Sequence, residues 1–121
     1  MLFRSIITGR TSNIVKQRSE NIGIAHFYQG VEDMLVAFNE LITKLNIAPE
    51  HAAFMGDDVV DMPPMLRCGF AISVPSAPMS VKNRAHFVTT KQGGHGAVRE
   101  LCELIMHAQG TFDAQMAQYF K

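Results

Sequence analysis

The sequence predicts an α/β fold in which a parallel sheet carries helices on both faces. Short apolar runs alternate along the chain with longer segments whose apolar residues recur every three or four positions. Such alternation is typical of strand–helix–strand units, whose crossovers are right-handed and whose strands run parallel. With 121 residues and 47% hydrophobic content, the chain can bury one core, so we predict a single domain over residues 1–121.

The expected strands are short runs rich in apolar residues, and polar or glycine-containing turns separate them. They cover residues 5–8, 25–28, 52–55, 69–74 and 87–89. Helices are expected between most of these strands, and proline, threonine or glycine marks several of their ends. They cover residues 11–21, 31–45, 62–68, 80–85, 97–109 and 111–120, the last with Thr111 as its cap.

Two of these helices show a defined apolar side. In residues 31–45, apolar side chains recur at three- and four-residue steps, at Leu35, Phe38, Leu41, Ile42 and Leu45. In residues 11–21, we expect Ile14, Val15 and the following Ile22 to face the core, and Lys16, Arg18 and Glu20 to face water.

An acidic turn follows the expected strand 52–55 directly and suggests a metal site. Asp57, Asp58 and Asp61 stand within five positions, and carboxylates this close raise each other's pKa unless a cation neutralises them. Magnesium prefers such oxygen ligands, one or two from protein and the rest from water and phosphate. The alternative is an acidic turn without a metal, in which Asp61 caps the helix that begins before Pro63.

A second strand end carries groups that suit a phosphate. Residues 5–8 end in Thr8, whose hydroxyl can donate to a phosphate oxygen, and Gly9 lets backbone N–H groups approach an anion closely. Arg10 adds a positive charge, and a helix that starts near residue 11 adds a favourable dipole. In open α/β sheets, ligands bind outside the carboxyl ends of the strands, so both sites would face one crevice.

Four segments resemble a known family in order and spacing: residues 6–10 (Ile-Ile-Thr-Gly-Arg), 28–30 (Tyr-Gln-Gly), 56–61 (Gly-Asp-Asp-Val-Val-Asp) and 93–100 (Gly-Gly-His-Gly-Ala-Val-Arg-Glu). The resemblance is to the haloacid-dehalogenase superfamily, and within it to the small capless phosphatases of the 3-deoxy-D-manno-octulosonate 8-phosphate type, which serve lipopolysaccharide biosynthesis. It implies a three-layer, Rossmann-like fold and a magnesium-dependent sugar-phosphate phosphatase that assembles as a homotetramer.

The resemblance also assigns roles to single residues. It implies that Asp57 binds magnesium directly, that Asp58 supports the bound waters, and that Thr8 and Gly9 hold a phosphoryl oxygen. Arg18 is either part of a solvated helix face or an arginine that reaches the substrate carboxylate of a neighbouring subunit. The glycines of residues 93–96 are either turn geometry or part of a loop that closes over the active site.

Two catalytic elements of that family are missing from this sequence. Its members open with an Asp-x-Asp strand that supplies the nucleophile, but no aspartate precedes Asp33 here. They also carry a lysine in the following helix, where this chain has Met34, which cannot donate to a phosphate. We therefore expect an N-terminally truncated family member that is inactive alone, or a remnant that acts as a binding or assembly module.

The missing strand leaves a question about the sheet, because by resemblance it occupies the middle. Either residues 5–8 pair directly with residues 52–55, or another chain fills the gap, or the chain is a piece of a longer product. Without that strand, two interior strand edges would be unpaired and apolar surface would be exposed, and this loss approaches the whole stability of a domain.

The remaining composition points to an ordinary cytoplasmic protein. Lys+Arg and Asp+Glu balance at 11 each, and neither a basic stretch for nucleic acid nor an apolar run for a membrane is present. Cys68 and Cys102 are expected to be buried thiols, and the scattered histidines lack metal-ligand spacing. We expect most methionines to fill the core, among them Met34, Met55, Met62, Met65, Met79, Met106 and Met116.

Overall fold

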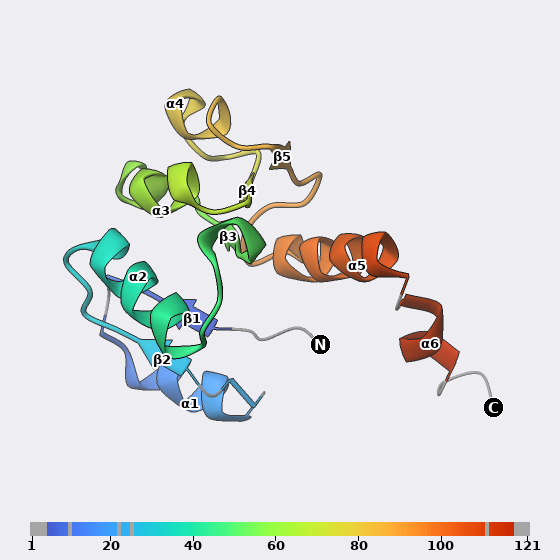
Figure 1. Ribbon diagram of the computed structural model, residues 1–121, viewed down its shortest axis with the longest axis horizontal. Coiled ribbons are helices and arrows are strands. Elements are labelled where there is room, and N and C mark those ends of the chain that lie inside the picture. Colours follow the sequence, from blue (N-terminus) through green and yellow to red (C-terminus); the bar gives the residue numbers. More distant parts are fainter. Residues whose placement is uncertain (1–4, 10, 22, 25, 111, 118–121) are drawn as a thin grey trace.

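The computed structural model describes residues 5–9, 11–21, 23–24, 26–110 and 112–117. Strands and helices alternate along the chain as predicted (Figure 1). The strands are β1 (Ser5–Ile7), β2 (His26–Tyr28), β3 (Ala53–Met55), β4 (Phe70–Ser73) and β5 (Phe87–Val88). The α-helices are α1 (Asn13–Asn21), α2 (Met34–Lys44), α3 (Met62–Arg67), α4 (Met79–Lys82), α5 (Ala97–Gln109) and α6 (Phe112–Ala117), and the 3-10 helices are η1 (Pro49–His51) and η2 (Val59–Asp61).

All strand pairs are parallel, but the sheet is divided into two hydrogen-bonded parts. β1 pairs with β2, and β3, β4 and β5 form a second part with β4 in its middle. In the part of the chain that the structure describes, no pairing joins β1 to β3. Of the three alternatives for the sheet, direct pairing of residues 5–8 with residues 52–55 is therefore excluded among the described residues, because β1 and β3 belong to separate hydrogen-bonded parts.

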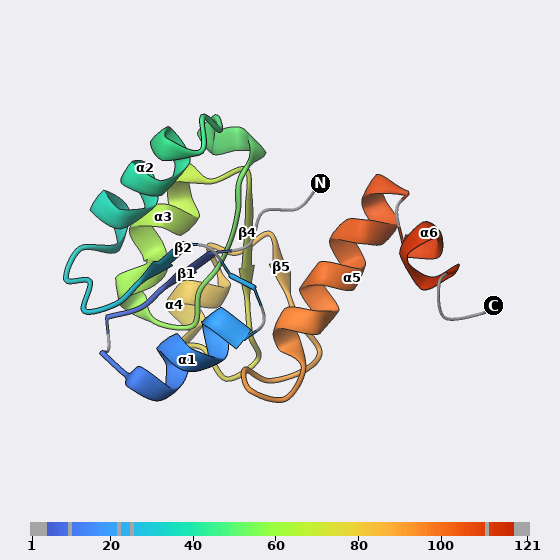
Figure 2. The ribbon, with the colours of Figure 1, turned by 90° about the horizontal axis from the view of Figure 1, so that it is seen from below.

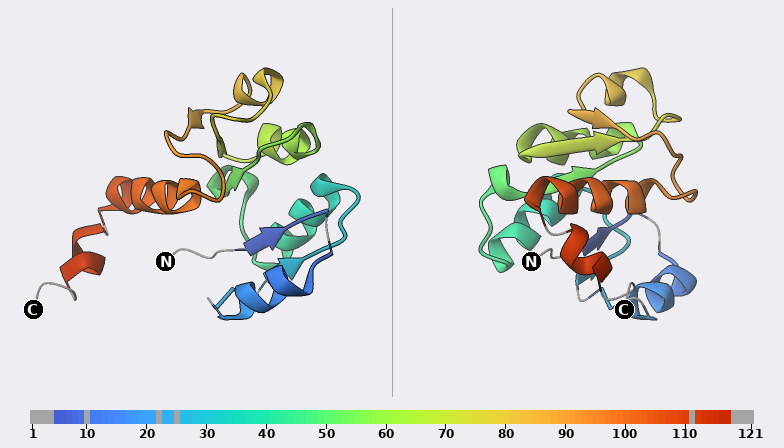
Figure 3. Two further views of the ribbon diagram at one scale, coloured as in Figure 1. Left: turned by 180° about the vertical axis from the view of Figure 1, so that it is seen from behind. Right: turned by 90° about the vertical axis from the view of Figure 1, so that its right-hand side faces the viewer.

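Helices lie on both sides of the strands, as the fold class requires. α2 and α3 cover one side, and α5 lies on the opposite side (Figure 2). Seen end-on to the longest axis, α5 crosses in front of the division between the two parts of the sheet (Figure 3). The main core is formed by Phe38, Ile42, Met65, Cys68, Ala71, Val74, Ala77, Val81 and Ala97.

Helix α2 connects the two parts of the sheet, and its sequence explains why it forms. Its N-terminus is capped by Asp33, whose carboxylate accepts from the backbone N–H groups of Leu35 and Val36. Its buried residues follow the helical period, at Met34, Ala37, Phe38, Leu41 and Ile42. Leu35 and Leu45, which we predicted to share this stripe, are only half-buried.

Three residues that we predicted to lie in the core are exposed instead. In α1, Ile14 is 81% exposed and Val15 is 42% exposed, and Ser19 is the buried residue. Met79, at the start of α4, is 65% exposed. In α1 the sequence pattern defines an apolar side, but no neighbouring element in the described residues covers it. Ile22 and Thr111 lie outside those residues.

Candidate active site

The acidic turn after β3 is folded around the carboxylate of Asp61. Its Oδ2 accepts hydrogen bonds from the backbone N–H groups of Asp57 at 3.0 Å and Asp58 at 3.2 Å. Asp58 Oδ1 in turn accepts from the N–H of Val59 at 2.7 Å, which completes a capping box for η2. Asp61 occupies the N-cap position of α3, but its side chain makes no cap bond there because it is committed to the preceding turn.

The strand end that carries this turn is fixed by β4. The N–H of Gly56 donates to the Ile72 carbonyl at 3.0 Å, and Ser73 Oγ donates to the Gly56 carbonyl at 2.8 Å. A side chain cannot be accommodated at position 56, since an added Cβ would lie 2.5 Å from Asp61 Cβ and 2.9 Å from Met65 Sδ. Asp57 therefore leaves β3 from a backbone with little freedom.

The electrostatics of this turn are dominated by Asp61. Burial raises the pKa of Asp61, the charge of the neighbouring Asp57 raises it further, and the two backbone hydrogen bonds partly oppose this. An acid whose pKa is raised by folding holds its proton more tightly in the folded state, so its ionisation at neutral pH lowers stability. The pKa of one carboxyl group of this turn is therefore raised as predicted, but the main cause is burial and not the charge of a neighbouring aspartate.

The predicted metal ligands Asp57 and Asp58 are both exposed at the end of β3. Asp58 uses one carboxylate oxygen to cap η2, and the Asp57 carboxyl group lies within hydrogen-bond reach of Asp61. Among the described residues, no group of three histidine, cysteine, aspartate or glutamate side chains could hold a metal ion. The two carboxylates of Asp57 and Asp58 fit a magnesium ion that keeps most of its waters and takes only one or two ligands from the protein.

The predicted phosphate-binding residues lie at the end of β1. Thr8 extends the pairing with β2: its N–H donates to the Tyr28 carbonyl at 2.8 Å, and its carbonyl accepts from Val31 at 3.0 Å. Met34 closes this turn from the side of α2, because its terminal methyl lies 3.8 Å from where a Cβ on Gly9 would stand. Met34 is 8% exposed. The position at which the resemblance expects a lysine therefore adjoins Gly9.

Of the two arginines predicted to bind the substrate, the structure describes Arg18 alone. Arg10 lies outside the described residues. Arg18 is exposed in the last turn of α1, and among the described residues no hydrogen bond or ion pair links it to Thr8, Gly9 or the acidic turn. Its proposed role toward a neighbouring subunit stays a prediction.

Helix α2 holds both strand ends in one framework. It contacts β1 and η2, and the Phe38 ring packs edge-on against Phe54 of β3, with ring centroids 5.8 Å apart. Ile7 and Met55, which end β1 and β3, pack against the same core. A common site for Thr8 and Asp57 is consistent with this arrangement and stays a prediction.

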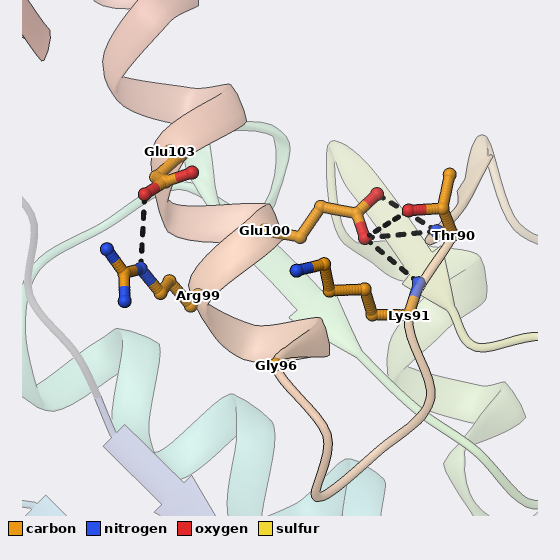
Figure 4. A pocket seen from close by; sticks show the side chains of 6 residues that line it. All are labelled: Thr90, Lys91, Gly96, Arg99, Glu100 and Glu103. Carbon is orange, nitrogen blue, oxygen red and sulfur yellow. Dashed lines mark hydrogen bonds and ion pairs between the residues drawn. The ribbon is translucent and has the colours of Figure 1, made fainter.

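Sequence reasoning missed the role of Glu100, which ties the segment that follows β5 to α5. Its carboxylate accepts from the N–H and the hydroxyl of Thr90 and from the N–H of Lys91, at 2.9 to 3.0 Å. Figure 4 shows this contact beside a hollow of about 410 Å³, with the Arg99–Glu103 ion pair on its other side. No local signal could have revealed the bond, because its partners stand nine and ten residues away.

The Glu100 contact predicts a pH dependence of stability. The hydrogen bond from Thr90 is the main cause that lowers the pKa of Glu100 below its ordinary 4.5. Stability from a lowered carboxyl pKa is present above the unfolded-state pKa and is lost as the pH falls through the folded-state pKa. We expect Glu100→Gln to reduce the loss of stability between neutral pH and about pH 3, measured by urea unfolding.

The control for this experiment is Glu103→Gln, which removes an exposed ion pair between residues one helical turn apart. Its acid limb should match that of the wild type. Equal acid limbs for Glu100→Gln and the wild type would show that the loop contact does not contribute to stability.

Residues 35–101 match the protein-family model described as haloacid dehalogenase-like hydrolase. This match covers more than half of the 121 residues. The chain belongs to the haloacid dehalogenase-like hydrolase family. The resemblance drawn from the four sequence segments is thereby confirmed.

Curated relatives within this family are sugar-phosphate phosphatases. The chain is 45% identical over 114 residues to the 3-deoxy-D-manno-octulosonate 8-phosphate phosphatase of Escherichia coli K12, and 45% identical over 109 residues to that of Yersinia pestis. The first alignment covers 94% of this chain and 61% of the relative, and the second covers 90% and 58%. The haloacid dehalogenase-like chain thus spans about three fifths of the length of these relatives.

The fold of this chain is also similar to solved structures of phosphatases. The 3-deoxy-D-manno-octulosonate 8-phosphate phosphatase of Moraxella catarrhalis, in complex with magnesium, phosphate and KDO, superposes with a TM-score of 0.92 at 45% identity. The probable YrbI family phosphatase of Pseudomonas syringae gives a TM-score of 0.94 at 42% identity. The superpositions cover 95% and 97% of this chain, and 66% of each of those chains. The Rossmann-like α/β fold predicted from the sequence is confirmed.

Proposed function

We propose that this chain is the phosphatase domain of a magnesium-dependent sugar-phosphate phosphatase of the 3-deoxy-D-manno-octulosonate 8-phosphate type, and that it does not turn over substrate alone. The observation that carries the proposal is the acidic turn fixed at the end of β3, on the α2 framework that also holds Thr8 and Gly9. Support comes from relatives and solved structures that carry this activity in their names.

The roles of the residues follow from their chemistry. Asp57 would bind magnesium directly, and Asp58 would hold its coordinated waters. When bound, the ion would supply charge neutralisation and alignment of the phosphoryl group. The Thr8 hydroxyl and the Gly9 N–H would hold a second phosphoryl oxygen, and Arg10 and Arg18 would recognise the rest of the substrate.

The proposed lack of turnover rests on two features of this chain. No aspartate stands before Asp33, so no residue supplies the nucleophile that forms an aspartyl-phosphate in this family. Met34 adds no charge at the position next to Gly9. The division between β1 and β3 supports the idea that a further strand, which brings the nucleophile, is needed between them.

A binding or assembly module is the second candidate function. The observation that favours it is Met34 itself, since a buried methionine next to Gly9 suits packing and not phosphoryl transfer. In this case the chain would keep the fold and the anion site without catalysis. Neither candidate predicts turnover by this chain alone.

We expect little or no hydrolysis when the purified chain is incubated with magnesium and a small phosphomonoester such as p-nitrophenyl phosphate. The defects at the nucleophile and at Met34 act on the same transition state, and binding alone cannot compensate for them. Release of phosphate above the uncatalysed rate is the measurement, with Asp57→Ala as the matched variant. Substantial turnover that Asp57→Ala abolishes would require another nucleophile and would contradict the proposal.

Magnesium should stabilise the folded chain only at millimolar concentrations, because a site with one direct carboxylate is weak and magnesium gives up its waters reluctantly. In metal-free buffer, Asp57→Asn should raise the melting temperature, since it removes the charge that adds to the raised pKa of Asp61. The control is Glu40→Gln, at an exposed position of α2, which should leave the melting temperature unchanged. A micromolar magnesium affinity, or a lower melting temperature for Asp57→Asn, would mean that other ligands complete the site.

The homotetramer and the cytoplasmic location stay predictions. Among the described residues, no helix combines the length and the apolar content that a membrane crossing requires. Sedimentation of the purified chain would test the tetramer directly.

A further inference from the structure

We propose that Gln29 is a positioning residue, which holds the turn after β1 in the conformation that binds a phosphate or another small oxyanion. The inference rests on the proposed function, because Gln29 has this role only if the turn after β1 binds phosphate. Gln29 itself lies outside the groups that would touch the substrate. It starts from the contact between the turn after β1 and the turn after β2, which stand far apart in the sequence.

The central contact is a hydrogen bond between these two turns. Gln29 Oε1 accepts from the backbone N–H of Ser12 at 3.1 Å, across 17 positions of the sequence, and the contact is partly buried. Ser12 also caps α1, because its Oγ accepts from the N–H of Val15 at 3.3 Å. Ser12 is thus held by its side chain on one side and by Gln29 on the other.

Two further contacts surround the Gln29 bond. Gly30, with φ of 66°, lies close to Thr11, whose Oγ1 is 3.0 Å from where a Cβ on residue 30 would stand. On the opposite side of the turn, the Thr8 carbonyl accepts from the N–H of Val31 at 3.0 Å. Residues 29–31 therefore contact the turn both before and after Gly9.

Helix α1 cannot hold this turn by packing, which is why the Gln29 bond matters. Its apolar residues Ile14 and Val15 face solvent, and Ser19 is its buried residue among those described. A turn that binds an anion through backbone N–H groups must be ordered for those groups to point at the anion. Ordering it before binding reduces the entropy that the ligand must overcome.

The chemistry of the side chain fits the role. An amide oxygen accepts the Ser12 N–H without placing a negative charge beside the anion site. A glutamate at the same position would keep the hydrogen bond and repel the anion. A methionine of similar length would remove the hydrogen bond without adding charge. These two substitutions separate positioning from electrostatics.

The experiment uses the full chain with inorganic phosphate as the probe. Gln29→Met, Gln29→Glu and the wild type are compared by amide hydrogen exchange at Ser12 and by phosphate titration followed at the Thr8 and Gly9 amides. The matched control is Gln92→Met, which removes an equivalent bond in which Gln92 Oε1 accepts from the Ser76 N–H at 3.0 Å.

For Gln29→Met we expect faster exchange at Ser12 and phosphate binding that is about three- to tenfold weaker, the loss typical of one hydrogen bond. Gln29→Glu should keep slow exchange at Ser12 but still bind phosphate more weakly, with the difference reduced by salt. Gln92→Met should change neither measurement.

Three other outcomes would overturn the inference, and each points to a different step that fails. Unchanged Ser12 exchange in Gln29→Met means that the bond does not order the turn. Faster exchange with unchanged phosphate affinity means that the order does not serve binding. No phosphate response at Thr8 and Gly9 in the wild type contradicts the proposed function itself and leaves Gln29 without the role. If Gln29→Met does not fold, Gln29→Leu replaces it in the comparison, since it also removes the hydrogen bond without adding charge.

Discussion

Gly69→Ala is expected to destabilise the domain by more than about 3 kcal/mol, or to prevent folding altogether. Gly69 lies directly before β4 and close to η1, and its N–H donates to the carbonyls of Pro49 and Ala52, both at 3.0 Å. An added Cβ would collide with the carbonyl oxygen of Glu50 and lie 2.6 Å from its carbonyl carbon. These are backbone atoms, and no rotamer change can move them away.

The effect would extend beyond the contact, because β4 is the middle strand of its part of the sheet and contains Ile72 and Ser73, the residues that hold Gly56. Urea unfolding of Gly69→Ala is the measurement. Gly93→Ala is the control, since a Cβ there meets no atom within 4 Å. Similar stabilities for the two variants would show that η1 can move away from β4 at little cost.

Met34→Lys is expected to strengthen phosphate binding about tenfold or more, while it lowers stability in phosphate-free buffer by more than about 2 kcal/mol. Met34 is 8% exposed, and its terminal methyl adjoins Gly9. An ammonium group at this position would be charged and poorly hydrated until an anion pairs with it. Phosphate should therefore raise the melting temperature of the variant more than that of the wild type.

The control for this variant is Met34→Leu, which keeps an apolar side chain of similar volume and should change phosphate binding little. Thermal unfolding is measured with and without inorganic phosphate. If phosphate stabilises Met34→Lys no more than Met34→Leu, the turn at Gly9 does not bind the anion. The variant also tests whether restoring the charge makes the chain a better binding module without making it an enzyme.

The sequence predicted the elements and their order because the forces that shape them are local. The stripe of α2 depends on residues three and four positions apart, and Phe38, Leu41 and Ile42 were correctly expected to be buried. The acidic turn was located for the same reason, since its three aspartates are close neighbours in the chain. Which of them would be half-buried was not predictable, because the burial of Asp61 depends on how α3 packs against η2 and β3.

The tertiary structure decided which strands pair and which apolar faces are covered. Ile14 and Val15 are apolar at helical spacing, yet they are exposed because no distant segment in the described part of the chain packs on them. His86, which had no metal partner in the sequence, uses Nδ1 to accept from the buried Ala71 N–H at 2.8 Å. Gln29 and Glu100 likewise hold partners that stand 9 to 17 positions away.

Local periodicity and capping depend on residues within about one helical turn, so a sequence specifies them by itself. Strand partners, coverage and long-range hydrogen bonds depend on which distant segments meet in the folded chain. For this protein, the sequence alone was enough to predict the family and the α/β order, and the residues that it suggests for magnesium and phosphate stay predictions. Only the tertiary structure showed that β1 and β3 do not pair in the described residues, and that Met34 adjoins Gly9.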